Sequence, residues 1–177
     1  MAISQQTILD ILAPVCGTAV VAEEHRGDDT FVITPDDLLE AASELRDHPS
    51  AQFVMCNDIT AVDWFPKRKQ NRFEVVYMLT SLEHSQRIRL KVVLQGDDPV
   101  CPSVTEIWKS ANWYERETYD MYGIRFEGHP DLRRFYMPED YVNPETGEPI
   151  YPLRKDFPLM GIEQSLPLPE KYPNTGF

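Results

Sequence analysis

Residues 86–94 alternate between charged and apolar side chains, and this alternation restricts the fold more than any other feature of the sequence. Arg87, Arg89 and Lys91 carry the charge, and isoleucine, leucine and valine occupy the intervening positions. Successive side chains of a strand point to opposite faces of a sheet, so a period of two places the apolar set on one face. The segment therefore predicts a strand of an antiparallel sheet that is covered on one side only.

Other segments rich in β-branched or aromatic residues extend this predicted sheet. The predicted strands are residues 18–23, 30–33, 52–57, 59–65 and 73–81. The first two flank a turn at Gly27 to Asp29, which predicts a hairpin. The basic residues 67–72 are interpreted as the solvated tip of a second hairpin.

Two helices are predicted before the main strands. Residues 4–16 have apolar positions at helical spacing behind Ser4, a candidate N-cap, although Pro14 weakens the pattern. A second helix opens at Thr34 and Pro35 and is stopped by His48. Helices before and after a run of strands, without strand–helix alternation, predict an α+β fold with a mainly antiparallel sheet and flanking helices.

A third helix is predicted from Ser103 to Tyr122. Ser103 and Glu106 have the spacing of a capping box, and Gly123 stands where a left-handed terminating residue is expected. The stripe of apolar residues in this helix is flanked by one charge-dense turn, residues 115–120. A helix with so many charges, followed by a basic loop, predicts either a functional site or a docking surface.

The last part of the chain has a different composition. Nine prolines occur after residue 126, and proline removes a backbone donor, so we expect no regular element there. The same segment is too rich in aromatic and aliphatic residues for a free solvated tail. We therefore divide the chain into an α+β core, residues 1–126, and an extended arm, residues 127–177. The arm is expected to dock on partner subunits; wrapping around its own domain is the alternative.

Composition excludes several classes of function. A net charge of −12 argues against binding to nucleic acid or to an anionic membrane. Three cysteines, far apart and without a C-x-x-C pair, predict buried thiols rather than disulfides or an iron–sulfur site. No apolar run is long enough to predict a membrane span or a signal peptide.

The charged turn does not have the pattern of an active site. Glu115 and Glu117 would lie about 200° apart on a helix, so they cannot share one site. Arg116 and Asp120 are four residues apart and can pair with each other. His129, between glycine and proline, is interpreted as a loop hydrogen-bond donor rather than a metal ligand. Phosphate-binding loops and hydrolase motifs are absent from the sequence. We accordingly expect no catalytic, cofactor-binding or metal-binding residue in this chain.

The charged turn and the loop after it carry a family resemblance. Residues 115–124, ERETYDMYGI, followed by residues 129–134, HPDLRR, closely resemble the motif of the 30 kDa subunit family of respiratory complex I. Further segments that resemble this family are FEVVY at 73–77, SLEH at 81–84, ANW at 111–113 and PLRKDFPL at 152–159. The similarity spans roughly residues 30–160. Phe135 and Tyr136 depart from it, because the family more often has aliphatic residues there.

The resemblance implies a non-catalytic subunit in the peripheral arm of a proton-translocating NADH-quinone oxidoreductase. FMN and Fe–S clusters would be bound by partner subunits, and the chief neighbours would be the quinone-site subunit and the iron–sulfur subunits. The location implied is the cytoplasmic side of a bacterial inner membrane, peripheral, with membrane contact only through the complex. The residues that we hypothesise to dock on partners are Glu115, Arg116, Asp120, His129, Asp131, Arg133, Arg134, Leu153, Arg154, Lys155, Asp156 and Phe157.

Two alternatives to this role remain open at the level of the sequence. Membrane-bound hydrogenases and other quinone-linked dehydrogenases use similar subunits, so the electron donor is not determined. A free-standing acidic binding module is the other alternative, and it would have to explain the apolar arm.

Overall fold

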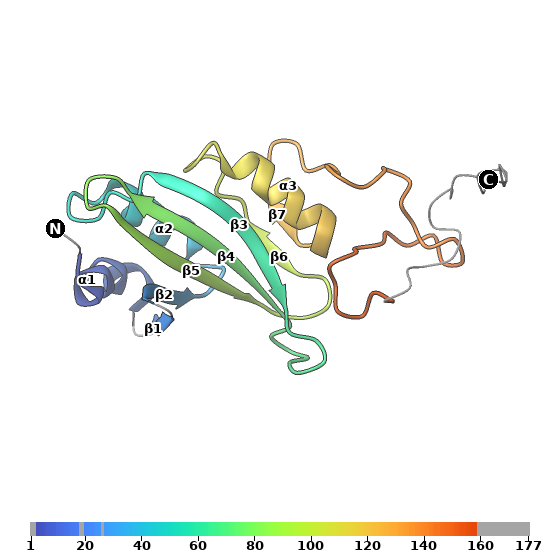
Figure 1. Ribbon diagram of the computed structural model, residues 1–177, viewed down its shortest axis with the longest axis horizontal. Helices are drawn as coiled ribbons and strands as arrows, with labels where there is room; N and C mark the ends of the chain where they lie inside the picture. The colour runs from blue at the N-terminus through green and yellow to red at the C-terminus, as the bar shows by residue number, and fades with distance from the viewer. Residues whose placement is uncertain (1–2, 18–19, 26, 159–177) are drawn as a thin grey trace, which may run out of the picture.

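The computed structural model describes residues 3–17, 20–25 and 27–158. Its centre is a five-stranded sheet with the strand order β1-β2-β5-β4-β3 (Figure 1). The strands are β1 Val21–His25, β2 Asp28–Ile33, β3 Met55–Asp63, β4 Phe73–Ser81 and β5 Gln86–Leu94. Every neighbouring pair is antiparallel except β2 and β5, which are parallel. The predicted α+β class with a mainly antiparallel sheet is therefore confirmed.

The predicted alternation in β5 is also confirmed. Ile88, Leu90 and Val92 are fully buried, and they pair in register with Leu79, Tyr77 and Val75 of β4, respectively. Arg87, Arg89 and Lys91 lie on the opposite face. The buried face is covered by α1, Gln5–Cys16, and α2, Leu38–Asp47, and Figure 1 shows α2 behind the sheet. Period-two patterning thus places the core on one side of the sheet.

The hairpin and the first two helices form close to where the sequence predicts them. β1 and β2 pair across Gly27, whose φ of +83° suits a tight turn; residues 18 and 19 of the predicted first strand lie outside the described residues. Ser4 caps α1 by accepting a hydrogen bond from the N–H of Thr7. The second helix begins at Leu38 rather than after Thr34, because residues 35–37 form a turn.

β3 differs from the prediction of two separate segments. Met55–Asp63 is a single strand, with a shift of register against β4 between Cys56 and Asp58. The extra residue of such a bulge interrupts the alternation, so one strand looks like two short ones in the sequence.

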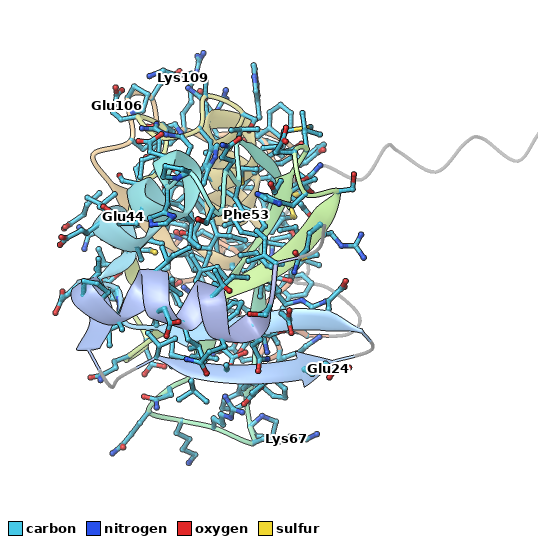
Figure 2. All side chains as sticks on the ribbon, turned by 90° about the vertical axis from the view of Figure 1, so that its left-hand side faces the viewer. Glu24, Glu44, Phe53, Lys67, Glu106 and Lys109 are labelled. Carbon is cyan, nitrogen blue, oxygen red and sulfur yellow. The ribbon has the colours of Figure 1, made fainter. Side chains whose placement is uncertain are left out.

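The predicted start of the third helix is wrong. The helix α3 spans Ala111–Tyr122, and residues 103–110 form turns and irregular backbone. Ser103 caps no helix; its hydroxyl donates to the carboxylate of Glu115 instead. Glu106 is exposed beside Lys109, and both lie at the outer margin of the molecule, away from the interior residue Phe53 (Figure 2). The capping-box spacing was therefore coincidental.

Two short strands flank α3 and direct the chain around it. β6, Val100–Pro102, pairs in parallel with β7, Arg125–Glu127, and the turn between α3 and β7 uses Gly123 in the left-handed conformation, as predicted. The hydroxyls of Ser110 and Thr118 donate to the carbonyls of Cys56 and Ile59 on β3, at 2.9 and 3.0 Å. α3 thus covers an edge strand that would otherwise expose unpaired backbone groups. In the described part of the chain no helix is long and apolar enough to cross a membrane.

Candidate docking site

Asp120, on the inner side of α3, organises the loop that follows β7. Its side chain is fully buried, and one carboxylate oxygen accepts hydrogen bonds from the N–H groups of Phe135, Tyr136 and Met137 at 3.0, 2.6 and 2.8 Å. The other oxygen pairs with Arg134 at 2.9 Å. A buried carboxylate is tolerated only when its oxygens are paired in this way. Asp120 therefore holds residues 134–137 against the helix.

Arg134 connects three parts of the structure. Besides Asp120 on α3, its guanidinium donates to the carbonyl of Tyr141 at 3.3 Å and to that of Ile150 at 3.2 Å. Only 9% of the Arg134 side chain is exposed. The planar fork of arginine can satisfy several fixed acceptors at once, which an ammonium group could not do with the same geometry. The first part of the arm is thereby fastened to the core.

Arg116 does not pair with Asp120, in contrast to the expectation from their spacing. Its guanidinium donates to the carbonyls of Arg133 and Arg134, at 3.2 and 3.1 Å, and lies over the ring of Trp113. Carbonyl groups of the loop accept hydrogen bonds from Arg116, and N–H groups of the loop donate to Asp120. These contacts form in place of the expected ion pair between Arg116 and Asp120. Arg116, Asp120 and Arg134 are called the inner charge cluster below.

Glu115 is buried on the side of α3 that faces β6. Its carboxylate accepts from the Ser103 hydroxyl and from the Val104 N–H, both at 2.7 Å. Burial raises the pKa of Glu115 to about 7, although these two hydrogen bonds act in the opposite direction. The folded state therefore favours the protonated form of Glu115.

This raised pKa gives a pH dependence that can be tested. Stability associated with Glu115 is fully present below its ordinary pKa of 4.5 and is lost as the pH rises through about 7. The unfolding free energy of the wild type is expected to fall by up to about 3 kcal/mol between pH 5 and pH 8 because of Glu115. We expect Glu115→Gln to lack this fall. Urea unfolding of both proteins across this range measures it, with Glu117→Gln as the control on the same helix. Parallel pH profiles for wild type and Glu115→Gln would contradict it.

The remaining charged residues of the loop lie nearer the surface. His129 contacts the carbonyl of Asn112 through Nε2 at 3.1 Å, and its Nδ1 accepts from the N–H of Asp131 at 3.0 Å. The predicted role of His129 as a loop hydrogen-bond donor is thus confirmed. Asp131 and Arg133 form an exposed ion pair at 3.0 Å, which contributes little to stability.

Gly123 is required both by its backbone and by its neighbours. Its φ is +73°, and a Cβ built there would lie 2.5 Å from the ring of Tyr151 and 2.7 Å from the guanidinium of Arg154. Arg154 in turn donates to the carbonyl of Tyr122 at 2.6 Å and lies over the Tyr151 ring. The backbone of Gly123, at the end of α3, therefore packs directly against the side chains of Tyr151 and Arg154 in the arm.

We expect Gly123→Ala to destabilise the protein by about 2–4 kcal/mol. The left-handed conformation costs an alanine about 1–2 kcal/mol, and displacing Tyr151 and Arg154 adds a similar amount. Thermal unfolding measures the effect. Gly128→Ala is the matched control, because Gly128 has a φ of +84° and a Cβ added there would meet nothing within 4 Å. Equal losses in the two variants would show that only the backbone conformation matters.

A second buried charge cluster fastens the later part of the arm. Asp63, at the end of β3, pairs with Arg72 through two hydrogen bonds of 2.9 and 2.7 Å, and Arg72 also pairs with Asp156 at 2.9 Å. Asp63 further accepts from the N–H groups of Phe65 and Lys155. Burial acts to raise the pKa of Asp63, but these hydrogen bonds outweigh it and lower the pKa.

The interpretation of residues 67–72 as a wholly solvated tip is therefore wrong for Arg72. Its side chain is 5% exposed, whereas that of Arg68 is 47% exposed. The position of Arg72 in the sequence indicated a contact with Asp63, because Arg72 directly precedes Phe73, the residue of β4 that lies opposite Asp63. The distant partner, Asp156, could not be identified from spacing.

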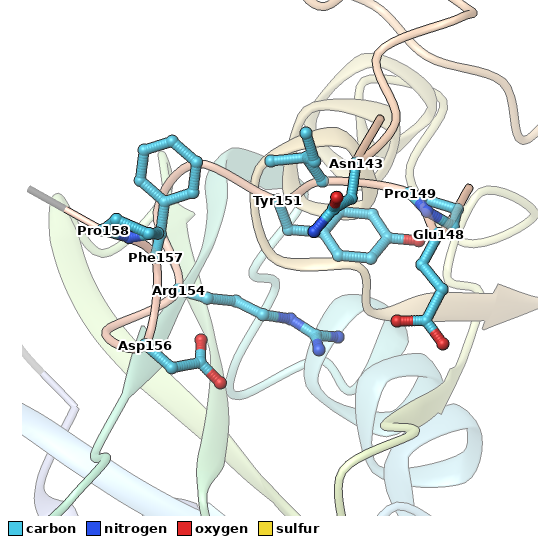
Figure 3. Close-up of a pocket in the computed structure, with 9 residues that line it drawn as sticks. Asn143, Glu148, Pro149, Tyr151, Arg154, Asp156, Phe157 and Pro158 are labelled. Atoms are coloured by element: carbon cyan, nitrogen blue, oxygen red, sulfur yellow. The ribbon is translucent and has the colours of Figure 1, made fainter. Parts of the chain in front are cut away.

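A hollow of about 440 Å³ lies within the arm and is lined by residues between Asn143 and Pro158. Figure 3 shows the side chains of Arg154 and Asp156 pointing into it, with Tyr151 and Phe157 from the same segment. Leu153 is 47% exposed, and the side chain of Lys155 is also exposed. Within residues 150–156, Arg154 and Asp156 thus contact the core, through Tyr122 and Arg72 respectively, whereas the side chains of Leu153 and Lys155 are exposed.

Comparison with known proteins assigns the family. Residues 31–163 match the family described as respiratory-chain NADH dehydrogenase, 30 kDa subunit. The chain belongs to this family. Among its relatives, the second NADH-quinone oxidoreductase C-subunit of Rhizobium etli is 48% identical over 140 residues, which cover 79% of this chain and 70% of the relative. The C-subunit of the Azorhizobium caulinodans enzyme is 48% identical over 161 residues, covering 89% and 72%.

Solved structures agree with this assignment to the 30 kDa subunit family. A trypsin-resistant fragment of Nqo5 is 31% identical, with a TM-score of 0.56, and the match covers 70% of this chain and 97% of the fragment. A chain of an archaeal respiratory membrane complex, the membrane-bound sulfane sulfur reductase, is 28% identical with a TM-score of 0.68, covering 88% and 86%. The predicted family and the predicted role as a subunit of NADH-quinone oxidoreductase are confirmed.

In this member of the 30 kDa subunit family, the hypothesised docking residues divide into two groups. The inward group forms contacts within the chain, and the outward group is exposed or partly exposed. The inward group is Glu115, Arg116, Asp120, Arg134, Arg154, Asp156 through its ion pair with Arg72 and, through its contacts with backbone groups, His129; the outward group is Asp131, Arg133, Leu153, Lys155 and Phe157. Docking by any of them stays a prediction, and Leu159 of the same motif lies outside the described residues.

Residues of a different kind were missed by the sequence reasoning. Trp113, Phe135 and Tyr136 are large aromatic side chains that remain exposed next to the inner charge cluster. The signals in the sequence were the departure of Phe135 and Tyr136 from the family pattern and the place of Trp113 in the family-like segment 111–113.

Potential metal ligands do not converge in the described part of this family member. Within residues 3–17, 20–25 and 27–158, no three His, Cys, Asp or Glu side chains are placed to hold a metal ion. The three cysteines are buried and free, as predicted. A chain without its own cofactor stays a prediction.

Proposed function

We propose that this chain is a non-catalytic subunit in the peripheral arm of a proton-translocating NADH-quinone oxidoreductase, where it holds neighbouring subunits in position. The observation that carries the proposal is the family match over residues 31–163, which includes the charged motif of α3. Charges of that motif, such as those of Asp120 and Arg134, are used in internal contacts that fix the loop and the arm. Such an arrangement suits a scaffold.

Neighbouring subunits of the complex supply the redox chemistry in this proposal. FMN and Fe–S clusters belong to them, and the chief neighbours of this chain are the quinone-site subunit and the iron–sulfur subunits. The chain lies on the cytoplasmic side of the inner membrane and reaches the membrane only through the complex. Support comes from the relatives, which are named as C-subunits of NADH-quinone oxidoreductase.

The arm beyond the core carries part of the docking in this proposal. Leu153 and Lys155 face outward from a segment that Arg72 and Asp63 hold on the core, so they are available to a neighbour. The trypsin-resistant fragment of the relative Nqo5 supports a division into a stable core and a separable arm.

A second candidate is the equivalent subunit of a related membrane complex. It is favoured by the similarity to a chain of the archaeal sulfane sulfur reductase, which extends over 88% of this chain. The fold would be the same in the two cases, and the electron donor would differ.

Affinity purification of the tagged chain from detergent-solubilised membranes of its native cells tests the two candidates. We expect co-purification of flavin- and iron–sulfur-containing subunits, with NADH-dependent reduction of quinone. Recovery of an intact complex that does not oxidise NADH would favour the second candidate. Recovery of the chain alone, without any redox subunit, would overturn both.

A further inference from the structure

Three aromatic side chains form a continuous exposed patch beside the inner charge cluster. Trp113 is 55% exposed, Phe135 39% and Tyr136 59%. The ring centroids of Trp113 and Phe135 are 5.2 Å apart, and those of Phe135 and Tyr136 are 4.4 Å apart. These three residues are called the aromatic patch. Exposed large apolar groups scattered singly are ordinary, but a contiguous group of this kind marks an interaction site.

Buried charged residues hold the aromatic patch in place. The backbone N–H groups of Phe135 and Tyr136 donate to the buried carboxylate of Asp120, and the guanidinium of Arg116 lies 4.9 Å from the Trp113 ring and 5.5 Å from the Phe135 ring. A side chain fixed before binding loses little conformational entropy on association. Arg116 and Asp120, which the sequence suggests as docking residues, therefore position the aromatic rings at the surface.

The surroundings of the aromatic patch indicate what it binds. None of the three aromatic residues lines the hollow within the arm or the one beside Arg133 and Arg134, and all three side chains are exposed, so they would enter a hollow on the partner. Tryptophan and tyrosine that fill such hollows are typical of the residues that dominate binding energy. Glu139 and Asp140, both exposed, follow within four residues of Tyr136, and the whole chain has a net charge of −12. Complementary charge on the partner is therefore basic.

We propose that the aromatic patch is a principal anchor to a neighbouring protein subunit, which receives Trp113 and Tyr136 in an apolar hollow bordered by Lys or Arg side chains. This inference rests on the proposed function, because it requires a multi-subunit complex. The aromatic residues make the contact with the neighbouring subunit, and Arg116 and Asp120 are positioning residues that support them from within the chain.

Site-specific photo-crosslinking in the assembled complex tests the assignment. Tyr136 is replaced by p-benzoylphenylalanine in the full chain, and Leu82, which is 62% exposed in the turn between β4 and β5, is replaced likewise as the control. We expect a crosslink to a different subunit from position 136, with crosslinked lysine- or arginine-containing peptides, and a weaker one or none from position 82. A crosslink within the chain, a crosslink to a second copy, or none at all from position 136 would overturn the assignment.

Exchange of the tagged chain into a complex that lacks it provides the second measurement. Trp113→Ala and Tyr136→Ala are expected to weaken incorporation at least about tenfold, whereas Tyr136→Phe and Leu82→Ala stay within about twofold. Circular dichroism on each variant checks that the core is folded. Normal incorporation of both alanine variants would overturn the inference and leave the proposed function intact. Failure of the wild-type chain to enter any complex would overturn the proposed function itself.

Discussion

Replacing Asp120 with alanine is expected to destabilise the protein by about 3–5 kcal/mol, because it leaves a buried arginine and three backbone N–H groups without their acceptor. The carboxylate of Asp120 is fully buried and accepts from Phe135, Tyr136, Met137 and Arg134. Urea unfolding followed by circular dichroism measures the change. Asp120→Asn keeps one acceptor oxygen and is expected to lie between wild type and Asp120→Ala.

Asp131→Ala is the matched control for this prediction. Asp131 lies in the same loop, but its side chain is 54% exposed and its ion pair with Arg133 is at the surface. We expect a change within about 0.5 kcal/mol. Comparable losses for Asp120→Ala and Asp131→Ala would mean that Asp120 does not organise the loop. The same contrast revises the expected role of Arg134, whose replacement would affect stability before it could affect docking.

The second large effect is expected at Asp63. Asp63→Ala removes the acceptor for Arg72 and for the Lys155 N–H, so we expect a loss of about 3–5 kcal/mol and release of the nearby arm. Trypsin cleaves after Arg154 and Lys155, and cleavage at these two sites should become faster than in the wild type. Asp97→Ala is the control, because Asp97 is 3.6 Å from the same guanidinium but 88% exposed. Unchanged cleavage after Lys155 in Asp63→Ala would show that the arm is held by other contacts.

The lowered pKa of Asp63 adds a pH signature to this experiment. The folded state favours the carboxylate, so the associated stability is present above the ordinary pKa of 3.8 and is lost as the pH falls through the lower folded pKa. Trypsin is inactive in that range, so unfolding must be followed spectroscopically. Asp63→Asn should lack this acid-dependent component and should differ least from the wild type at low pH.

Elements with a local repeat could be predicted from the sequence. β4 and β5 begin and end where the composition predicts, and Gly123 ends α3 in the left-handed conformation. Strand alternation, helix caps and turn glycines depend on residues within one or two turns of each other, so their physical cause is contained in a short segment. The family, too, follows from a continuous motif on α3 and the loop after it.

Partners of the buried charges were decided only by the tertiary structure. The sequence suggests that Ser103 caps a helix, that Arg116 pairs with Asp120 and that residues 67–72 are solvated. In the fold, Ser103 meets Glu115, and the carboxylate of Asp63 accepts from the N–H of Lys155, 92 positions away in the chain. Removing an ion from water is so costly that each buried charge takes whichever partners the packed chain brings to it, and local spacing does not select them.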